Sequence, residues 1–397
     1  MPAADFQINT TTQANQATTS TSLAINNLDE FVVVWTSDST LLSDQGTPEP
    51  EDDIYAGDRS GTGIFAQRYQ MDATTGQAQA IGTEFLINTT TLGNQQFPSV
   101  AIAKDNNSFV VTWTSPNQDG SGFGVYAQLY KVVNGVAVAQ FSTDLQVNTF
   151  TIGDQQRSTV AMDANGNFVV AWQSVNGLDI FAQRYNSEGV AQGGEFRVNT
   201  TTAGTQSRAA IAMDADGDFV IAWVDESGAD GNGFGIFLRR YDAAGVAQGN
   251  QIRVNTFTTG TQEEPSIAMN SAGEFVVTWT SLNQPGDTTR GVYGQRFSLV
   301  APDVTNPSGV VFQGTEFRAN TYTPNDQRAS SVSINQAGNF VVSWAGDGGS
   351  SADASGIYAR AYSADGTAQG DAVQVNVVTS GIQTAPSVGA QLSSAFV

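Results

Sequence analysis

Residues 195–241 read EFRVNTTTAGTQSRAAIAMDADGDFVIAWVDESGADGNGFGIFLRRY, and this stretch decides the fold. It holds four short segments that are apolar or alternate between apolar and polar residues: 195–199, 210–213, 219–223 and 235–241. Gly, Asn and Asp gather between these segments, as they do in hairpin turns. Because short alternating runs bounded by turn residues are typical of β-strands, the stretch predicts a four-stranded antiparallel unit.

The same unit recurs along the chain, and its most visible mark is a Trp at the end of a run similar to Phe-Val-Val-x-Trp. All six Trp residues occupy this position: Trp35, Trp113, Trp172, Trp223, Trp279 and Trp344. A strand that is apolar on both faces needs a neighbouring unit on each side, which repetition supplies. We therefore predict β-propeller blades with the small-residue strand innermost, the Glu-Phe-Arg-Val-Asn strand outermost, and the Trp side chains in the core. A β-solenoid is the competing architecture, but its shorter coils do not need two hairpins per repeat.

The link between an outer strand and the next inner strand has its own signature, Asn-x-x-Thr-x-x-x-Gln, which occurs seven times. Its Asn residues are Asn9, Asn88, Asn148, Asn199, Asn255, Asn320 and Asn376, and its Gln residues are Gln16, Gln95, Gln155, Gln206, Gln262, Gln327 and Gln383. We expect these amides to tie the irregular backbone between blades. Seven links predict an all-β, seven-bladed propeller of four-stranded antiparallel blades, formed by residues 1–397 as a single domain.

The seventh blade is expected to be split between the termini. Residues 6–10 supply its outer strand and residues 386–390 its inner strand, and the sequence stops two residues into the next strand, at Val397. This blade is therefore predicted to be incomplete, so that a continuation of the natural chain or a strand from a partner would fill it.

Composition excludes several classes of function. There are 16 basic and 38 acidic residues, for a net charge of −22, and no basic patch that could neutralise phosphates, so nucleic acid is not an expected partner. The chain has no Cys and no His, which excludes disulfides, thiol catalysis and His-dependent triads. No apolar stretch approaches the length of a membrane span, and residues 1–10 do not resemble a signal peptide, so no membrane insertion is predicted.

A repeated arginine precedes the last aromatic residue of the third strand, at Arg68, Arg184, Arg240 and Arg296. Sialidases, which are propellers, bind a carboxylate with an arginine cluster. One arginine per blade on an outer strand is instead expected to lie around the rim, where the four cannot converge on the axis.

Asp214, Asp216 and Asp218 place three carboxylates within one five-residue turn. Calcium prefers several such oxygens at short range, so this turn is a weak calcium candidate, and no other cofactor is predicted. The pattern lacks a distal Glu, and ordinary turn chemistry is the alternative. An acidic insertion at residues 37–60 is a second candidate for a cation or partner contact; it holds Asp44, Glu49, Glu51, Asp52, Asp53 and Asp58.

The repeat unit, with Asn117-Gln-Asp-Gly-Ser-Gly-Phe-Gly-Val-Tyr-Ala-Gln128 as its most specific stretch, resembles the repeats of large secreted bacterial proteins of the haemolysin (RTX-related) type. The resemblance implies a secreted or cell-surface protein, exported without an N-terminal signal peptide in this chain, with a structural or adhesive role. The glycine-rich calcium nonapeptide of RTX proteins is absent, so calcium binding is not implied for these repeats.

The leading functional prediction is a non-catalytic extracellular interaction or structural module, not an enzyme, that contacts a protein or glycan surface or sister subunits. A tandem-repeat lectin with equivalent glycan pockets between blades is one alternative. A propeller glycoside hydrolase or lyase is another; the lack of His and of any unique cluster of convergent carboxylates in the sequence speaks against it.

Overall fold

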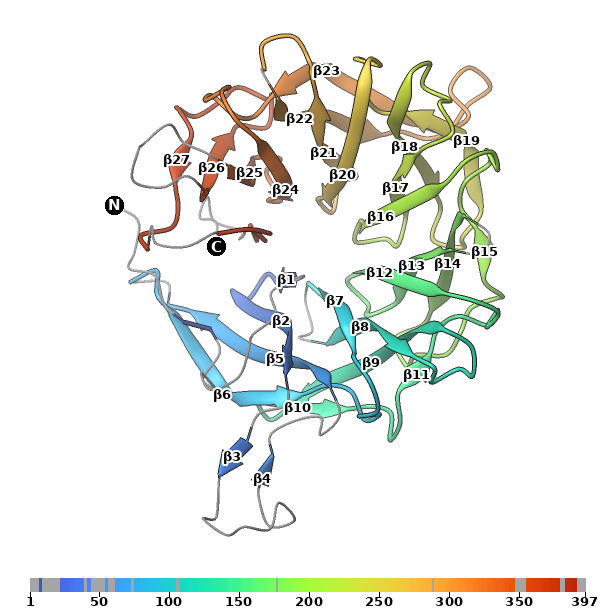
Figure 1. Cartoon of the computed structure of the whole chain (residues 1–397), viewed down its shortest axis with the longest axis vertical. Coiled ribbons are helices and arrows are strands. Elements are labelled where there is room, and N and C mark those ends of the chain that lie inside the picture. The colour runs from blue at the N-terminus through green and yellow to red at the C-terminus, as the bar shows by residue number, and fades with distance from the viewer. Residues whose placement is uncertain are drawn as a thin grey trace.

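The computed structural model describes residues 7–8, 22–38, 41–43, 54–55, 61–72, 75–104, 108–175, 178–287, 289–346, 355–378 and 383–390. These residues form an all-β propeller without helices, in which β-sheets are arranged as blades around a central axis (Figure 1). Within the described part of the chain, no helix has the length and hydropathy needed to cross a membrane.

Among the described residues, six blades of four or five strands follow one another around the ring; four are separate sheets, and blades 4 and 5 are joined into one eight-stranded sheet by the short parallel pairing of β18 with β20. Blade 1 contains β1 (Ser22–Ile25), β2 (Glu30–Asp38), β5 (Thr62–Met71) and β6 (Ala78–Leu86). Blade 2 contains β7 (Gln96–Ile102), β8 (Phe109–Pro116), β9 (Phe123–Val133), β10 (Val136–Ala139) and β11 (Leu145–Gln146), the last two both pairing with β9. Blade 3 contains β12 (Gln155–Met162), β13 (Phe168–Ser174), β14 (Asp179–Tyr185) and β15 (Phe196–Arg197).

The remaining blades repeat this plan. Blade 4 contains β16 (Gln206–Met213), β17 (Phe219–Asp225), β18 (Gly233–Tyr241) and β19 (Ala247–Arg253). Blade 5 contains β20 (Gly260–Met269), β21 (Glu274–Leu282), β22 (Arg290–Leu299) and β23 (Val310–Arg318). Blade 6 contains β24 (Gln327–Ile334), β25 (Phe340–Gly346), β26 (Gly356–Tyr362) and β27 (Val373–Gln374). In each blade the first strand lies innermost, the Trp strand second and the last strand outermost (Figure 1).

The hydrophobic core lies between blades rather than inside any one of them. One cluster joins Val110 and Val125 of blade 2 to Val160 and Trp172 of blade 3, and the other neighbouring pairs share equivalent clusters. Five of the six Trp side chains are fully buried, and Trp35 is 6% exposed. Because each apolar face needs the next blade, the blades stabilise one another as repeat units do.

The link Asn residues make the same two hydrogen bonds in every complete blade. Each Oδ1 accepts a bond from the backbone N–H at the start of the third strand, and each Nδ2 donates to the carbonyl two residues further on; the residues are Asn88, Asn148, Asn199, Asn255, Asn320 and Asn376. Three link Gln residues, Gln155, Gln206 and Gln327, accept the indole N–H of their own blade's Trp.

The described segments nearest the termini, residues 7–8 and 383–390, contact blades 1 and 6. The hydroxyl of Tyr69 donates to the carbonyl of Ile8, just as Tyr185 donates to Val147 in the preceding blade's outer strand. The N–H of Val388 donates to Ser331 Oγ of β24, and a Cβ on Gly389 would contact Leu23 and Ile25 of β1. Residues 388–389 therefore bridge the inner strands of blades 6 and 1.

The acidic insertion is described only in part. β3 (Leu41–Ser43) and β4 (Ile54–Tyr55) pair as a separate two-stranded sheet, which projects from the ring in Figure 1. The acidic residues proposed there, Asp44, Glu49, Glu51, Asp52, Asp53 and Asp58, lie outside the described residues.

Candidate functional site

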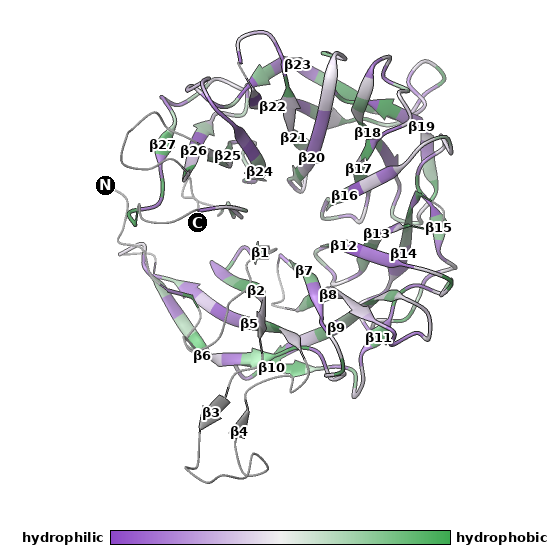
Figure 2. Cartoon of the chain, viewed as in Figure 1, coloured by the Kyte–Doolittle hydropathy of each residue, from purple (hydrophilic) through white to green (hydrophobic). Residues whose placement is uncertain are grey.

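The axial cavity is bordered by the innermost segment of every blade. Its lining combines residues of β1, β7, β12, β16, β20 and β24 with Val388 and Gly389. Polar residues colour parts of the inner strands β12, β16 and β20 purple in Figure 2. The cavity is lined by the second halves of these strands, whereas their starts, directly after each link Gln, each carry one residue with a left-handed backbone.

Each complete inner strand from β7 to β24 contains a one-residue β-bulge at the same place. The residue two positions after the link Gln has a φ between 52° and 57° and is never glycine: Phe97, Arg157, Arg208, Glu264 and Ala329, with Ala385 in the segment after blade 6. A non-glycine residue in this left-handed region costs about 1–3 kcal/mol. Bulges re-aim side chains, and they are enriched next to active sites.

The bulge residues of successive blades contact one another around the axis. The guanidinium carbon of Arg157 lies 4.5 Å from the ring centre of Phe97. Arg208 Nη1 lies 3.4 Å from Glu264 Oε1, and Glu264 Oε2 accepts the backbone N–H of Ala329 at 3.0 Å. Burial and the neighbouring charge of Arg208 both lower the pKa of Arg157. We call Phe97, Arg157, Arg208, Glu263, Glu264 and Ala329 the axial cluster.

Two carboxylates of the axial cluster come from consecutive residues, because the bulge interrupts the strand alternation that would separate them. Arg208 Nη1 lies 3.7 Å from Glu263 Oε2 and 3.4 Å from Glu264 Oε1. Glu263 also receives Arg290 Nε at 3.3 Å, and Arg290 reaches Asp326 at 3.1 Å. Thr280 Oγ1 donates to Glu264 at 2.9 Å. Acidic and basic groups from blades 4, 5 and 6 thus meet at one end of the inner strands.

Sequence reasoning missed the axial cluster. Glu263 and Glu264 are consecutive in the chain, but strand alternation places consecutive residues on opposite faces, and Arg208, which both approach, belongs to another blade. A usable signal was present: the two residues after each link Gln vary between repeats, while the Gln and the Trp do not.

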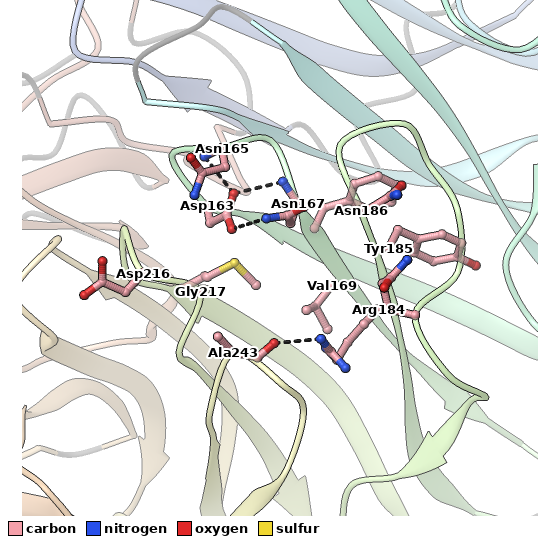
Figure 3. A pocket seen from close by; sticks show the side chains of 13 residues that line it. Asp163, Asn165, Asn167, Val169, Arg184, Tyr185, Asn186, Asp216, Gly217 and Ala243 are labelled. Carbon is pink, nitrogen blue, oxygen red and sulfur yellow. Dashed lines mark hydrogen bonds between the residues drawn. The ribbon is translucent and has the colours of Figure 1, made fainter.

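Pockets of a second type lie between neighbouring blades, away from the axial cluster. One pocket of about 280 Å³ between blades 3 and 4 is lined by Asp163, Asn165, Asn167, Arg184 and Asn186, among others (Figure 3). Another, between blades 5 and 6, uses equivalent positions, with Glu274 in place of Asn167 and Arg296 in place of Arg184. Equivalent pockets of this kind are what a tandem-repeat lectin requires.

The repeated arginines lie in the outer part of the blades and join neighbours. Arg68 donates to Gly135 O, Arg184 to Ala243 O, Arg240 to Val300 O and Arg296 to Ala364 O, in each case a carbonyl of the next blade. They do not converge on the axis.

The three aspartates of the calcium candidate do not converge on a common point. Asp214 Oδ1 accepts the N–H groups of Asp216 and Asp218, which closes the turn. Asp218 forms an ion pair with Arg240 at 2.7 Å and accepts the N–H of Ala243. Burial, followed by the charge of Asp218, raises the pKa of Asp214 to about 6. Among the described residues, no group of three or more acidic side chains is arranged to hold a metal ion.

No protein-family model matches the chain, and no curated protein sequence matches it. Several solved structures are similar in fold. The Penicillium chrysogenum α-L-arabinanase complexed with arabinobiose is 12% identical, with a TM-score of 0.48, over 74% of this chain and 84% of that one. A protein of unknown function from Dyadobacter fermentans is 12% identical, with a TM-score of 0.49, over 86% and 93%. The leech intramolecular trans-sialidase is 7% identical, with a TM-score of 0.48, over 82% and 64%.

At these identities the likeness is one of fold, and it assigns no residue of this chain to an active site. The neighbours with a named activity are nevertheless carbohydrate-active enzymes. This contradicts two predictions made from the sequence, that the chain is a non-catalytic interaction or structural module and that it is not an enzyme. The physical premise of both predictions was also wrong, because Glu263 and Glu264 do converge, through the bulge of β20.

Proposed function

We propose that this protein is a glycoside hydrolase whose substrate binds over the axial cluster. The observation that carries the proposal is the pair Glu263 and Glu264. Both carboxylates lie within 4 Å of the same nitrogen of Arg208, at 3.7 Å and 3.4 Å. The two oxygens are therefore at most about 7 Å apart, so the pair does not exceed the separation of about 5–9.5 Å that glycoside hydrolases use between their two carboxylates.

The surroundings of the pair fit this chemistry. One carboxyl group protonates the leaving oxygen, while the other acts as nucleophile or activates a water molecule. Thr280 and the N–H of Ala329 hold Glu264 in place by hydrogen bonds, and Arg290 holds Glu263. Phe97 and Arg157 continue the axial cluster beyond Arg208, with the guanidinium of Arg157 over the ring of Phe97. No step of this reaction requires the His or Cys that the chain lacks.

The test is a screen of the full chain against aryl glycosides and polysaccharides, including arabinan and sialosides, with release of aglycone or reducing ends as the readout. Glu263→Gln and Glu264→Gln should each lower kcat at least 100-fold on any substrate turned over. Glu316→Gln is the matched control, because Glu316 accepts bonds from Thr256 in an outer link and should leave kcat unchanged. Full activity in both axial variants would overturn the proposal.

We also propose that the ring has seven blades, the seventh being split between the termini. Three observations support this count: the bond from Tyr69 to Ile8, the bonds of Val388 and Ala390 to the serines of β24, and the left-handed φ of Ala385 at the bulge position. A crystal structure in which the two terminal segments occupy different blades would contradict it. Secretion, and the resemblance to haemolysin-type repeats, stay predictions, testable by locating the protein in fractions of its source cells.

A further inference from the structure

The pocket between blades 3 and 4 lies where blade 3 lacks an ion pair that blades 1 and 4 form. In blades 1 and 4 the third-strand arginine pairs with the acid that begins, or directly precedes, the second strand. Arg68 bonds Glu30 at 3.0 Å, and Arg240 bonds Asp218 at 2.7 Å. Both arginines are buried. In blade 3 the acid is replaced by Asn167, and within the described residues no carboxylate lies within ion-pair distance of Arg184.

Asn167 does not substitute for the missing acid, because its amide is used elsewhere. Its Nδ2 donates to Asp163 Oδ2 at 2.7 Å, while Asp163 Oδ1 accepts the N–H groups of Asn165 and Asn167 (Figure 3). Two N–H groups of Arg184 donate hydrogen bonds to the carbonyls of Ala243 and Ala244. Its guanidinium is half-buried, and burial lowers its pKa against the opposing effect of Asp242. An anion that enters the pocket would stabilise this half-buried guanidinium by a charge-assisted hydrogen bond.

The rest of the lining favours a ligand with hydroxyl groups. Asn165, Asn186 and Gln192 line the pocket with side-chain amides. Asn186 Oδ1 and Gln192 Nε2 bond the backbone of their own turn, which leaves a donor on Asn186 and an acceptor on Gln192 for a ligand. Phe168 and Val169 supply apolar surface beside them. We propose that this pocket binds an acidic monosaccharide unit, with its carboxylate on Arg184 in the place that Asp218 takes in blade 4 and its hydroxyls on the amides.

The equivalent pocket between blades 5 and 6 provides an internal comparison. Its arginine, Arg296, has the repeat's acid, Glu274, beside it: burial lowers the pKa of Arg296, and the charges of Asp365 and Glu274 oppose this. Glu274 also accepts Asn270 Nδ2 at 2.8 Å. An incoming carboxylate is repelled by Glu274, so we expect one acidic-sugar site per chain.

The experiment is calorimetric titration of the full chain with glucuronate, glucose and acetate. Glucuronate should bind with a stoichiometry of one and at least tenfold more tightly than the other two. Asn167→Asp restores the acid of the repeat, so it should lower glucuronate affinity at least tenfold. Arg184→Gln should abolish binding, whereas Arg296→Gln, the matched control, should not change it.

Each other result overturns the proposal. If glucose binds as tightly as glucuronate, the carboxylate is not recognised, and if acetate does, the sugar is not recognised. If Asn167→Asp leaves glucuronate affinity unchanged, glucuronate binds at another place. Because Asn167→Asp keeps the bonds of Arg184 to blade 4, its readout does not depend on a variant that fails to fold. Glucuronate binding is independent of the axial cluster, so failure here leaves the proposed hydrolysis standing.

Discussion

Replacing Ala329 by glycine tests whether the inner-strand bulges are strained. Ala329 has a φ of 53°, and its two contacts to blade 5 come from its backbone N–H, which donates to Glu264 Oε2 and Thr280 Oγ1. Ala329→Gly therefore keeps both bonds and removes only the Cβ. Relief of left-handed strain contributes about 1–3 kcal/mol. The extra flexibility of glycine in the unfolded chain costs about 0.5–1 kcal/mol. We expect a net stabilisation of about 1 kcal/mol from these two effects.

The matched control is Ala212→Gly, in the inner strand β16. Ala212 is buried, pairs with Val220 in an unbroken stretch of ladder and has no left-handed φ. Glycine there should destabilise the protein by about 1 kcal/mol, since it adds flexibility and removes a packed methyl group. Urea denaturation followed by Trp fluorescence measures both free energies of unfolding. Equal destabilisation by the two substitutions would refute the strain, and with it the argument that strain marks the axial cluster as functional.

Three further predictions concern the framework. Trp223→Ala should lower the free energy of unfolding by about 3–5 kcal/mol, because the ring is fully buried and bonds Gln206; a loss under about 1 kcal/mol in urea denaturation would contradict the packing. Arg240→Ala should cost about 3–5 kcal/mol in the same assay, because it leaves Asp218 without its buried partner, and a loss no larger than that of Arg184→Ala would contradict this. The raised pKa of Asp214, about 6, means that the folded protein binds this proton more tightly than the unfolded chain, so its contribution to stability is present below about pH 4 and lost as pH rises through about 6. Asp214→Asn, which copies Asn270 of blade 5, should therefore raise the melting temperature at pH 7 but not at pH 4; parallel pH profiles for the two proteins would contradict it.

The propeller could be predicted because its determinants are repeated in the sequence. Trp172 and Trp223 end the same apolar run, and Asn148 and Asn199 make the same backbone bonds. Residues that every blade needs recur in every repeat. The strand order within a blade could therefore be predicted from the pattern of apolar and polar residues.

The axial cluster could not be predicted in the same way, for two physical reasons. Arg208 and Glu264 are 56 positions apart in the sequence, and only the packing of blade 4 against blade 5 brings them to 3.4 Å. A bulge turns Glu263 and Glu264 toward the same arginine. This bulge needs a left-handed φ at a residue that is not glycine, and no turn-forming residue in the sequence marks its position. The sequence pattern also predicted the same role, a calcium ligand, for Asp214 and Asp218. In the structure Asp214 closes a turn and Asp218 pairs with Arg240.

The central claim is that substrate binds over the axial cluster, and a crystal structure of Glu264→Gln soaked with a saccharide that the wild-type protein hydrolyses tests it most directly. The side chain of Glu264 is held at the axis by Thr280 and the N–H of Ala329, both of which the glutamine oxygen still accepts, so the site should remain intact. The account predicts saccharide density at the axis, with the scissile bond beside residues 263 and 264 and a sugar oxygen on Arg208. Density confined to the pockets between blades, with an empty axis, would contradict it.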